Sequence, residues 1–241
     1  MTSTAAAAHA TRLRQVGLLL AIGGAVAFSA KAIVAKLIYR YGVDAVTLIA
    51  WRMTLALPFF VAMAWWGGRG RAPIRSHQWP QVALLGFTGY YLASFLDFWG
   101  LEYISASLER LILYLSPTFV LLLGRVFLGK PIGLMQLGAM ALSYTGIALV
   151  FGHEVRLEGR DTLIGGTMVL GSAISYATYL LLSGQLVREV GSMRLVGMAS
   201  VFASVLCLLQ FAALRPLASA VVAAPVVWRS LVNALGCTAL P

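Results

Sequence analysis

The chain has 241 residues, of which 60% are hydrophobic and only 11% are charged. A soluble domain carries about 25% charged residues, so this composition excludes a water-soluble fold and indicates a membrane protein with several spans. The net charge of +10 comes from bases in short loops and not from a basic domain, which excludes nucleic acid as a partner and leaves the lipid bilayer.

Seven segments are long and apolar enough to cross a membrane as helices, since about 20 residues span the hydrocarbon core. An eighth begins near Trp228. In chain order, the seven expected spans are residues 16–38, 45–66, 82–104, 107–128, 132–152, 163–187 and 194–214. The sequence therefore predicts an all-α polytopic membrane protein.

The residue pattern of the first span occurs again in the sixth. Gly17 and Gly23 of the first copy correspond to Gly165 and Gly171 of the second. Five spans precede the second copy, so it crosses the membrane in the opposite direction. Paired inverted repeats of this kind are typical of secondary transporters.

The repeat divides the chain into four parts and predicts a ten-helix carrier fold that is cut within its eighth helix, near Pro241. The four parts are an N-terminal tail (1–15), a first five-helix repeat (16–152), an inter-repeat loop (153–162) and an incomplete second repeat (163–241).

The bases gather mainly on one side of the predicted membrane. Arg12 and Arg14 precede the first span, and Arg69, Arg71 and Arg75 follow the second. Cytoplasmic loops carry an excess of Lys and Arg, so the N-terminal tail is predicted to be cytoplasmic. The first apolar run also resembles a cleavable signal peptide, but its internal counterpart favours a retained helix.

Three charged residues lie inside expected spans, where a charge is costly and faces protein or water. Lys31 either lines a cavity or extends its ammonium group to the membrane surface. Arg52 either pairs with Asp44 or Glu102 or binds an anionic group through its planar guanidinium. Asp97 either takes up and releases a proton during transport or forms a buried pair with Lys31 or Arg52.

Tyrosines are expected to form the amphipathic walls of a substrate cavity. Tyr90 shares the helical face of Asp97, and the second copy carries Tyr176 and Tyr179 on the face that corresponds to that of Lys31. Hydrogen bonding between helices is the alternative for these side chains. The candidate wall residues are Tyr90, Tyr114, Tyr176 and Tyr179.

Pro117 lies in the middle of the fourth span, where proline kinks a helix and frees the carbonyl of Leu113. Such a kink beside a cavity is a candidate hinge, and a plain packing feature is the alternative. Glu109 opens the same span, where the helix macrodipole is a sufficient reason for a carboxylate.

Motifs typical of enzymes are absent from the sequence. It has no paired metal ligands and no Gly-rich phosphate loop, and all three histidines lie outside the expected spans. Cys207 and Cys237 lie in apolar segments and are interpreted as packing residues. The sequence therefore predicts no catalytic residue, no metal site and no cofactor.

Three segments carry a resemblance to a known family. They are Trp51-Arg52-Met53, the pair Leu115-Ser116-Pro117 and Phe127-Leu128-Gly129-Lys130, and the glycine-rich stretch from Gly138 to Gly146. In their order and spacing they resemble the EamA-type carriers of the drug/metabolite transporter superfamily. That family usually has glutamate where this chain has Lys130, so a role for that acid does not carry over.

The resemblance implies a secondary transporter of the bacterial inner membrane that moves a small metabolite or drug by alternating access. It also implies a central cavity between two five-helix repeats. Proton coupling and a homodimer stay open as further expectations. The alternative is a non-transporting scaffold or sensor subunit, or an inactive fragment.

Overall fold

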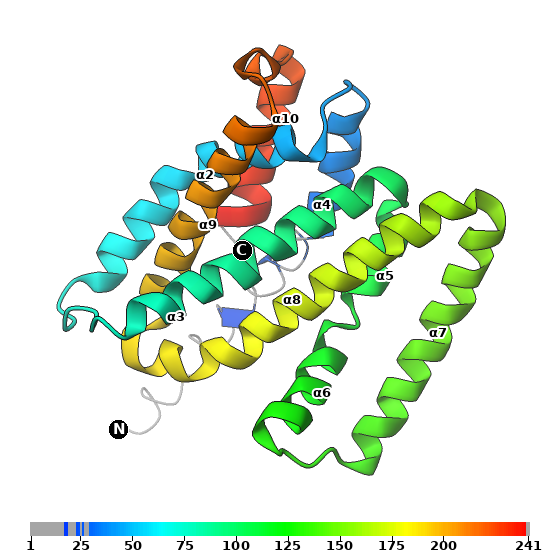
Figure 1. Cartoon of the computed structure of the whole chain (residues 1–241), viewed down its shortest axis with the longest axis horizontal. Helices are drawn as coiled ribbons and strands as arrows, with labels where there is room; N and C mark the ends of the chain where they lie inside the picture. The colour runs from blue at the N-terminus through cyan, green and yellow to red at the C-terminus, as the bar shows by residue number, and fades with distance from the viewer. Residues whose placement is uncertain (1–16, 19–22, 25, 27–28, 240–241) are drawn as a thin grey trace, which may run out of the picture.

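Figure 1 shows the computed structural model of the chain, which describes residues 17–18, 23–24, 26 and 29–239. For residues 154–158 it describes the backbone alone. The expected N-terminal tail and part of the first span lie outside the described residues. The described part of the first span includes a continuous helix over residues 29–39.

Every further element of the described chain is helical, and six helices in this part are long and apolar enough to cross a membrane. This confirms the predicted all-α, multi-span class. The elements are α2 (Ala45–Gly68), α3 (Gln78–Leu85), η1 (Gly86–Leu92), α4 (Ala93–Tyr103), α5 (Ala106–Leu113), α6 (Ser116–Leu128), α7 (Leu134–Glu158), α8 (Arg160–Val190), α9 (Ser192–Leu214), η2 (Leu217–Ala220), α10 (Ala224–Ala234) and η3 (Leu235–Ala239).

Two expected boundaries differ from the structure. The segment expected as a loop before the sixth span is mostly helical, because α7 continues to Glu158 and α8 begins at Arg160. Gly159 alone separates the two helices, with a φ of +64° that favours glycine. The eighth helix, expected near Trp228, already begins at Ala224, where Pro225 in its first turn suits a helix start.

The third span contains a π-helical segment, η1, between two α-helices. Two glycines allow other helices to approach it closely. A Cβ atom on Gly86 would lie 2.6 Å from the carbonyl oxygen of Ala199, and one on Gly89 would lie 2.4 Å from the Tyr179 side chain. The wider turn of η1 changes which side chains share a face before and after it.

Helix α4 packs along α8 at a contact between two glycine backbones. A Cβ atom on Gly100 would lie 2.7 Å from the carbonyl oxygen of Gly165, and one on Gly165 would lie 2.7 Å from that of Gly100. Small residues of this kind let membrane helices approach closely. Gly165, noted in the sequence as part of the repeat, therefore has a packing reason to be glycine.

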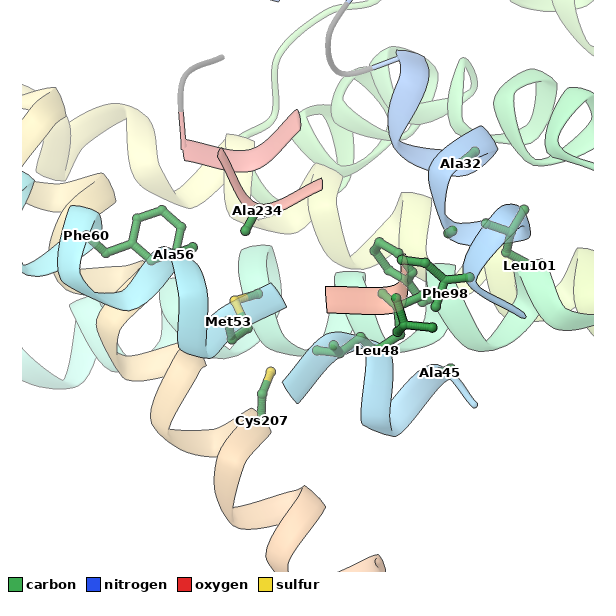
Figure 2. Close-up of a cluster of buried hydrophobic side chains, with 14 residues drawn as sticks. Ala32, Ala45, Leu48, Met53, Ala56, Phe60, Phe98, Leu101, Cys207 and Ala234 are labelled. Carbon is green, nitrogen blue, oxygen red and sulfur yellow. The ribbon is translucent and has the colours of Figure 1, made fainter. Parts of the chain in front are cut away.

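The largest apolar core joins five segments of the chain, as Figure 2 shows. It combines side chains of residues 29–39, α2, α4, α9 and α10. Phe98 of α4 is fully buried among them, with Leu48 and Met53 of α2 close by and Cys207 contributed by α9. Cys207 is a buried free cysteine, as expected for a packing residue.

Hydrogen bonds hold the helices of this bundle together at each of its two ends. At one end, Arg71 donates to the carbonyl of Val190, and Arg194 donates to that of Ala72. These bonds join the α2–α3 and α8–α9 connections, which lie side by side at the lower left of Figure 1. At the other end, the Trp51 indole donates to the carbonyl of Ala220.

We predict that Gly100→Ala will destabilise the fold, because its methyl group must displace the Gly165 carbonyl or open the α4–α8 contact. Overpacking of this kind costs roughly 1–3 kcal/mol. The free energy of unfolding in mixed detergent and dodecyl sulfate micelles measures the change. Gly146→Ala in α7 is the control, since a Cβ atom there meets no described atom within 4 Å. Equal stability of both variants would refute the close contact.

Candidate functional site

A buried ion pair joins the first helix to α4. The ammonium group of Lys31 donates to Oδ2 of Asp97, and the two residues are 6% and 2% exposed. Lys31 therefore does not extend to the membrane surface. Of the alternatives that the sequence leaves open for Asp97, the structure contains the buried pair with Lys31.

A second carboxylate faces the same ammonium group. Oε1 of Glu109, on α5, lies 3.8 Å from Lys31 Nζ. Glu109 is 0% exposed, and its Oε2 lies 3.2 Å from Nε of Arg110. Lys31, Asp97, Glu109 and Arg110 form what we call the buried charge cluster. Two carboxylates share one lysine in it, which limits the repulsion between them.

Arg52 of α2 lies next to this cluster and is 3% exposed. Its Nη2 donates to Ser94 Oγ at 2.9 Å, and its guanidinium carbon lies 4.6 Å from the centroid of the Phe98 ring. The same ring lies 5.2 Å from Lys31 Nζ. Phe98 thus contacts both cations through its electron-rich face.

Neutral groups fix the backbone around the cluster. Asn233 of α10 donates to the carbonyl of Lys31 at 3.2 Å, and the Tyr39 hydroxyl donates to the carbonyl of Phe98 at 2.6 Å. Ser105 caps α5 by accepting from the amide of Leu108. These bonds hold the helices that carry Lys31 and Asp97, and Ser105 fixes the start of the helix that carries Glu109.

The sequence interpretation missed Glu109 as a member of the site. Its place in the first turn of α5 fits the helix macrodipole, as expected, and that explanation hid its burial. A fully buried carboxylate needs a partner inside the protein. The available signal was the apolar run that follows Glu109-Arg110, which places both charges at the edge of a span.

The proposed partners of Arg52 are engaged elsewhere. Asp44 forms an ion pair with Arg215 at 2.9 Å, and Glu102 accepts from the amide of Ala45. Burial raises the pKa of Asp44, but the polar groups of Thr47 and the charge of Arg215 outweigh it, so the pKa lies below its usual value. Asp44 therefore stays ionised at neutral pH.

Asp44 and Glu102 also line a surface pocket of about 310 Å³. Its walls are Lys36, Tyr39, Gly42, Val43, Asp44 and Glu102. Tyr39 lines this pocket, and its hydroxyl donates to the backbone carbonyl of Phe98, the residue whose ring contacts both Lys31 and Arg52.

Three of the four candidate tyrosines form a separate group. The hydroxyls of Tyr90 and Tyr179 lie 3.1 Å apart, and the rings of Tyr176 and Tyr179 stack with centroids 5.7 Å apart. Tyr90, in the π-helical segment, faces α8, whereas Asp97 and Ser94 face Lys31 and Arg52. The common face expected for Tyr90 and Asp97 is therefore not present. Tyr114 is 69% exposed.

Pro117 lies in the first turn of α6 and not within a continuous helix. The fourth span is broken at Tyr114 and Leu115. Pro117 has no N–H to offer the carbonyl of Leu113, which instead accepts from the Ser116 hydroxyl at 2.7 Å. The expected mid-helix kink is thus a break between two helices, because proline suits a helix start better than a helix interior. A hinge at this break stays a prediction.

The cluster predicts strong coupling between Lys31 and Asp97. Lys31→Gln leaves Asp97 and Glu109 without a shared cation and should cost about 3–5 kcal/mol, whereas Asp97→Asn leaves Glu109 beside Lys31 and should cost less. A double-mutant cycle on unfolding free energies should give a coupling of about 0.5–3 kcal/mol. Lys130→Gln, in an exposed loop, is the control. Additive effects of the two substitutions would contradict the pair.

The sequence is similar to proteins that are named as a transporter or an exporter. The chain is 27% identical over 168 residues to the uncharacterized transporter YcbK of Bacillus subtilis, covering 69% of this chain and 54% of that protein. It is 29% identical over 144 residues to a probable terminal-alkyne amino-acid exporter of Streptantibioticus cattleyicolor, covering 59% and 47%. The chain spans about half the length of the curated relatives it matches.

A solved crystal structure has a similar fold, with a TM-score of 0.61 and 19% sequence identity over 92% of this chain and 75% of that one. At this identity the likeness supports the fold alone. The model of the EamA-like transporter family matches residues 15–152, a segment that holds Lys31, Arg52, Asp97 and Glu109. This match covers more than half of a multi-pass membrane protein, and the chain therefore belongs to the EamA-like transporter family.

Proposed function

We propose that the protein is a secondary transporter that moves a small molecule across a bacterial inner membrane by alternating access, with the buried charge cluster as its coupling centre. The observation that carries this proposal is the sharing of Lys31 by Asp97 and Glu109 inside a bundle of apolar spans. Ionisable groups at such depth are expensive, and in transporters they mark ion and proton pathways.

The cluster offers a physical route to proton coupling. When a proton binds one of the two carboxylates, the other one still neutralises Lys31, so the lysine is never left as an isolated charge. Uptake and release of the proton therefore change the net charge of the cluster without breaking its last ion pair. A change in this charge alters how strongly Asp97 holds the first helix to α4, which links protonation to helix position.

The remaining parts of the proposal follow the two-repeat arrangement expected from the sequence. The repeats rock against each other around a cavity walled by Tyr90, Tyr114, Tyr176 and Tyr179, and the break at Pro117 acts as a hinge. The N-terminus lies in the cytoplasm. The family match and the transporter names of the relatives support transport as the activity.

One relative carries the name of a probable terminal-alkyne amino-acid exporter, which makes amino acids suitable first probes. The competing role is a non-transporting scaffold or sensor subunit. A growth assay under amino-acid overload separates the two, because a carrier protects the cell and a scaffold does not.

We predict that Asp97→Asn will abolish flux driven by a pH gradient. The substitution keeps the shape of the side chain, but the amide can neither bind the proton nor carry the negative charge. Proteoliposomes that hold the full chain are given a pH gradient of either direction, and uptake of labelled L-propargylglycine is measured. Uptake by the wild type should change with the direction of the gradient. In the variant, this gradient-dependent part of the uptake should be at least tenfold smaller.

Asp161→Asn is the matched control, since Asp161 is an exposed carboxylate in the first turn of α8. It should leave the response unchanged. Flux that is the same in the wild type and Asp97→Asn across a pH series would end the coupling proposal. Helical content, measured for all three proteins, confirms that the variants are folded.

A further inference from the structure

We infer that Arg52 binds a carboxylate group of the transported molecule, so that the substrate class is small organic monocarboxylates, amino acids included. This inference rests on the proposed function and adds a substrate class and a binding residue to it. The starting observation is that Arg52 is a buried cation whose described contacts include no carboxylate.

Arg52 differs in its partners from the cations of the buried charge cluster. Lys31 contacts Asp97 and Glu109, and Arg110 contacts Glu109. Arg52 has a hydroxyl and an aromatic ring as its described partners. Its Nε is buried and has no hydrogen-bond partner among the described residues. A buried charged group without a full set of partners is costly, and a bound anion would remove this cost.

The donors of Arg52 suit a carboxylate. Guanidinium has five N–H donors in a planar fork. On Arg52, Nε has its single N–H unused, and Nη2 gives one N–H to Ser94 and keeps another. Two parallel N–H donors on one edge match the two oxygens of a carboxylate in a bidentate pair, which is among the strongest hydrogen-bonded arrangements in proteins.

Charge favours a carboxylate over a phosphate group. Arg52 offers one positive charge, which a carboxylate neutralises. A phosphate monoester carries about −1.5 to −2 at neutral pH and would leave excess negative charge beside Asp97 and Glu109. The existing carboxylates also exclude Lys31 as the substrate contact, because a third carboxylate on that ammonium would be repelled by the other two.

The depth of Arg52 excludes a lipid headgroup as the anion. Arg52 lies seven residues after Ala45, the first residue of α2, and a rise of 1.5 Å per residue places it roughly 10 Å inside the helix. A molecule that reaches it must enter the bundle. A shallow surface pocket of about 310 Å³ includes Tyr39 among its walls, and the Tyr39 hydroxyl bonds to the backbone carbonyl of Phe98.

Arg52 and the charge cluster therefore have separate tasks. Arg52 binds the substrate anion, while Asp97 and Glu109, which share Lys31, bind and release the proton. Phe98 lies between them and contacts both Arg52 and Lys31. A carboxylate that binds Arg52 repels the nearby carboxylates and so favours their protonated form, which couples substrate binding to the protonation of the cluster.

The test uses proteoliposomes that hold the full chain. Uptake is first measured for the labelled standard L-amino acids, and the one with the highest flux is then compared with its own carboxamide and its aminophosphonate analogue. We expect the KM of the carboxamide to be at least tenfold higher than that of the acid, because the carboxamide cannot form the charged pair. The aminophosphonate should also bind more weakly than the acid.

The variant Arg52→Lys keeps the charge and removes the fork. It should raise the KM for the acid at least tenfold and change the KM for the carboxamide less than twofold. Arg69→Lys is the control, since Arg69 also lies against an aromatic ring, 3.8 Å from the Trp65 centroid, but follows the end of α2. This control should leave both values unchanged.

The outcomes separate the inference from the proposed function. Equal KM values for acid and carboxamide in the wild type, or an unchanged KM for the acid in Arg52→Lys, would overturn the inference while transport stands. Preference for the aminophosphonate would replace carboxylates by phosphate-like anions and also overturn it. Absence of uptake for every amino acid would also overturn the inference, while transport of another class of small molecule would still stand as the proposed function.

Discussion

The ion pair between Lys31 and Asp97 is the buried charged contact that joins the helix over residues 29–39 to the rest of the bundle. A lysine at this depth among apolar spans needs a negative partner, since its charge has no water to solvate it. The partner lies on α4, and Glu109 on α5 adds a second carboxylate to the same ammonium. One electrostatic demand thus joins three segments that are far apart in the sequence, and Asn233 of α10 binds the backbone of the same lysine.

Close packing around this cluster depends on glycine and not on bulk. Gly100 and Gly165 let α4 and α8 meet through their backbones, and Gly89 makes room for the ring of Tyr179. Phe98 lies on the side of α4 opposite to Gly100 and is buried in the core with α2, while Asp97 contacts Lys31. Close packing of α4 against α8 gives the charge cluster a rigid frame, because a packed contact persists while a charge beside it changes.

Much of the fold followed from hydropathy, and less of the site did. The spans over α2, α8 and α9 were predicted to within a few residues because an apolar run of about 20 residues has few alternatives. Lys31, Arg52 and Asp97 were found because charges are rare in such runs. The π-helical turn moved Tyr90 away from the face of Asp97, which no periodicity of 3.6 residues foretells. Glu109 was missed because its place in the first turn of α5 already had a sufficient local explanation.

The central claim is that the carboxylates beside Lys31 exchange a proton inside the membrane. Infrared difference spectroscopy of the reconstituted protein tests this most directly, because a protonated carboxyl group has its own carbonyl band. The account predicts a band that grows as the pH falls through the range in which transport varies, and that changes in both Asp97→Asn and Glu109→Gln. A band that is absent, or that is identical in the wild type and both variants, would contradict proton exchange at this cluster.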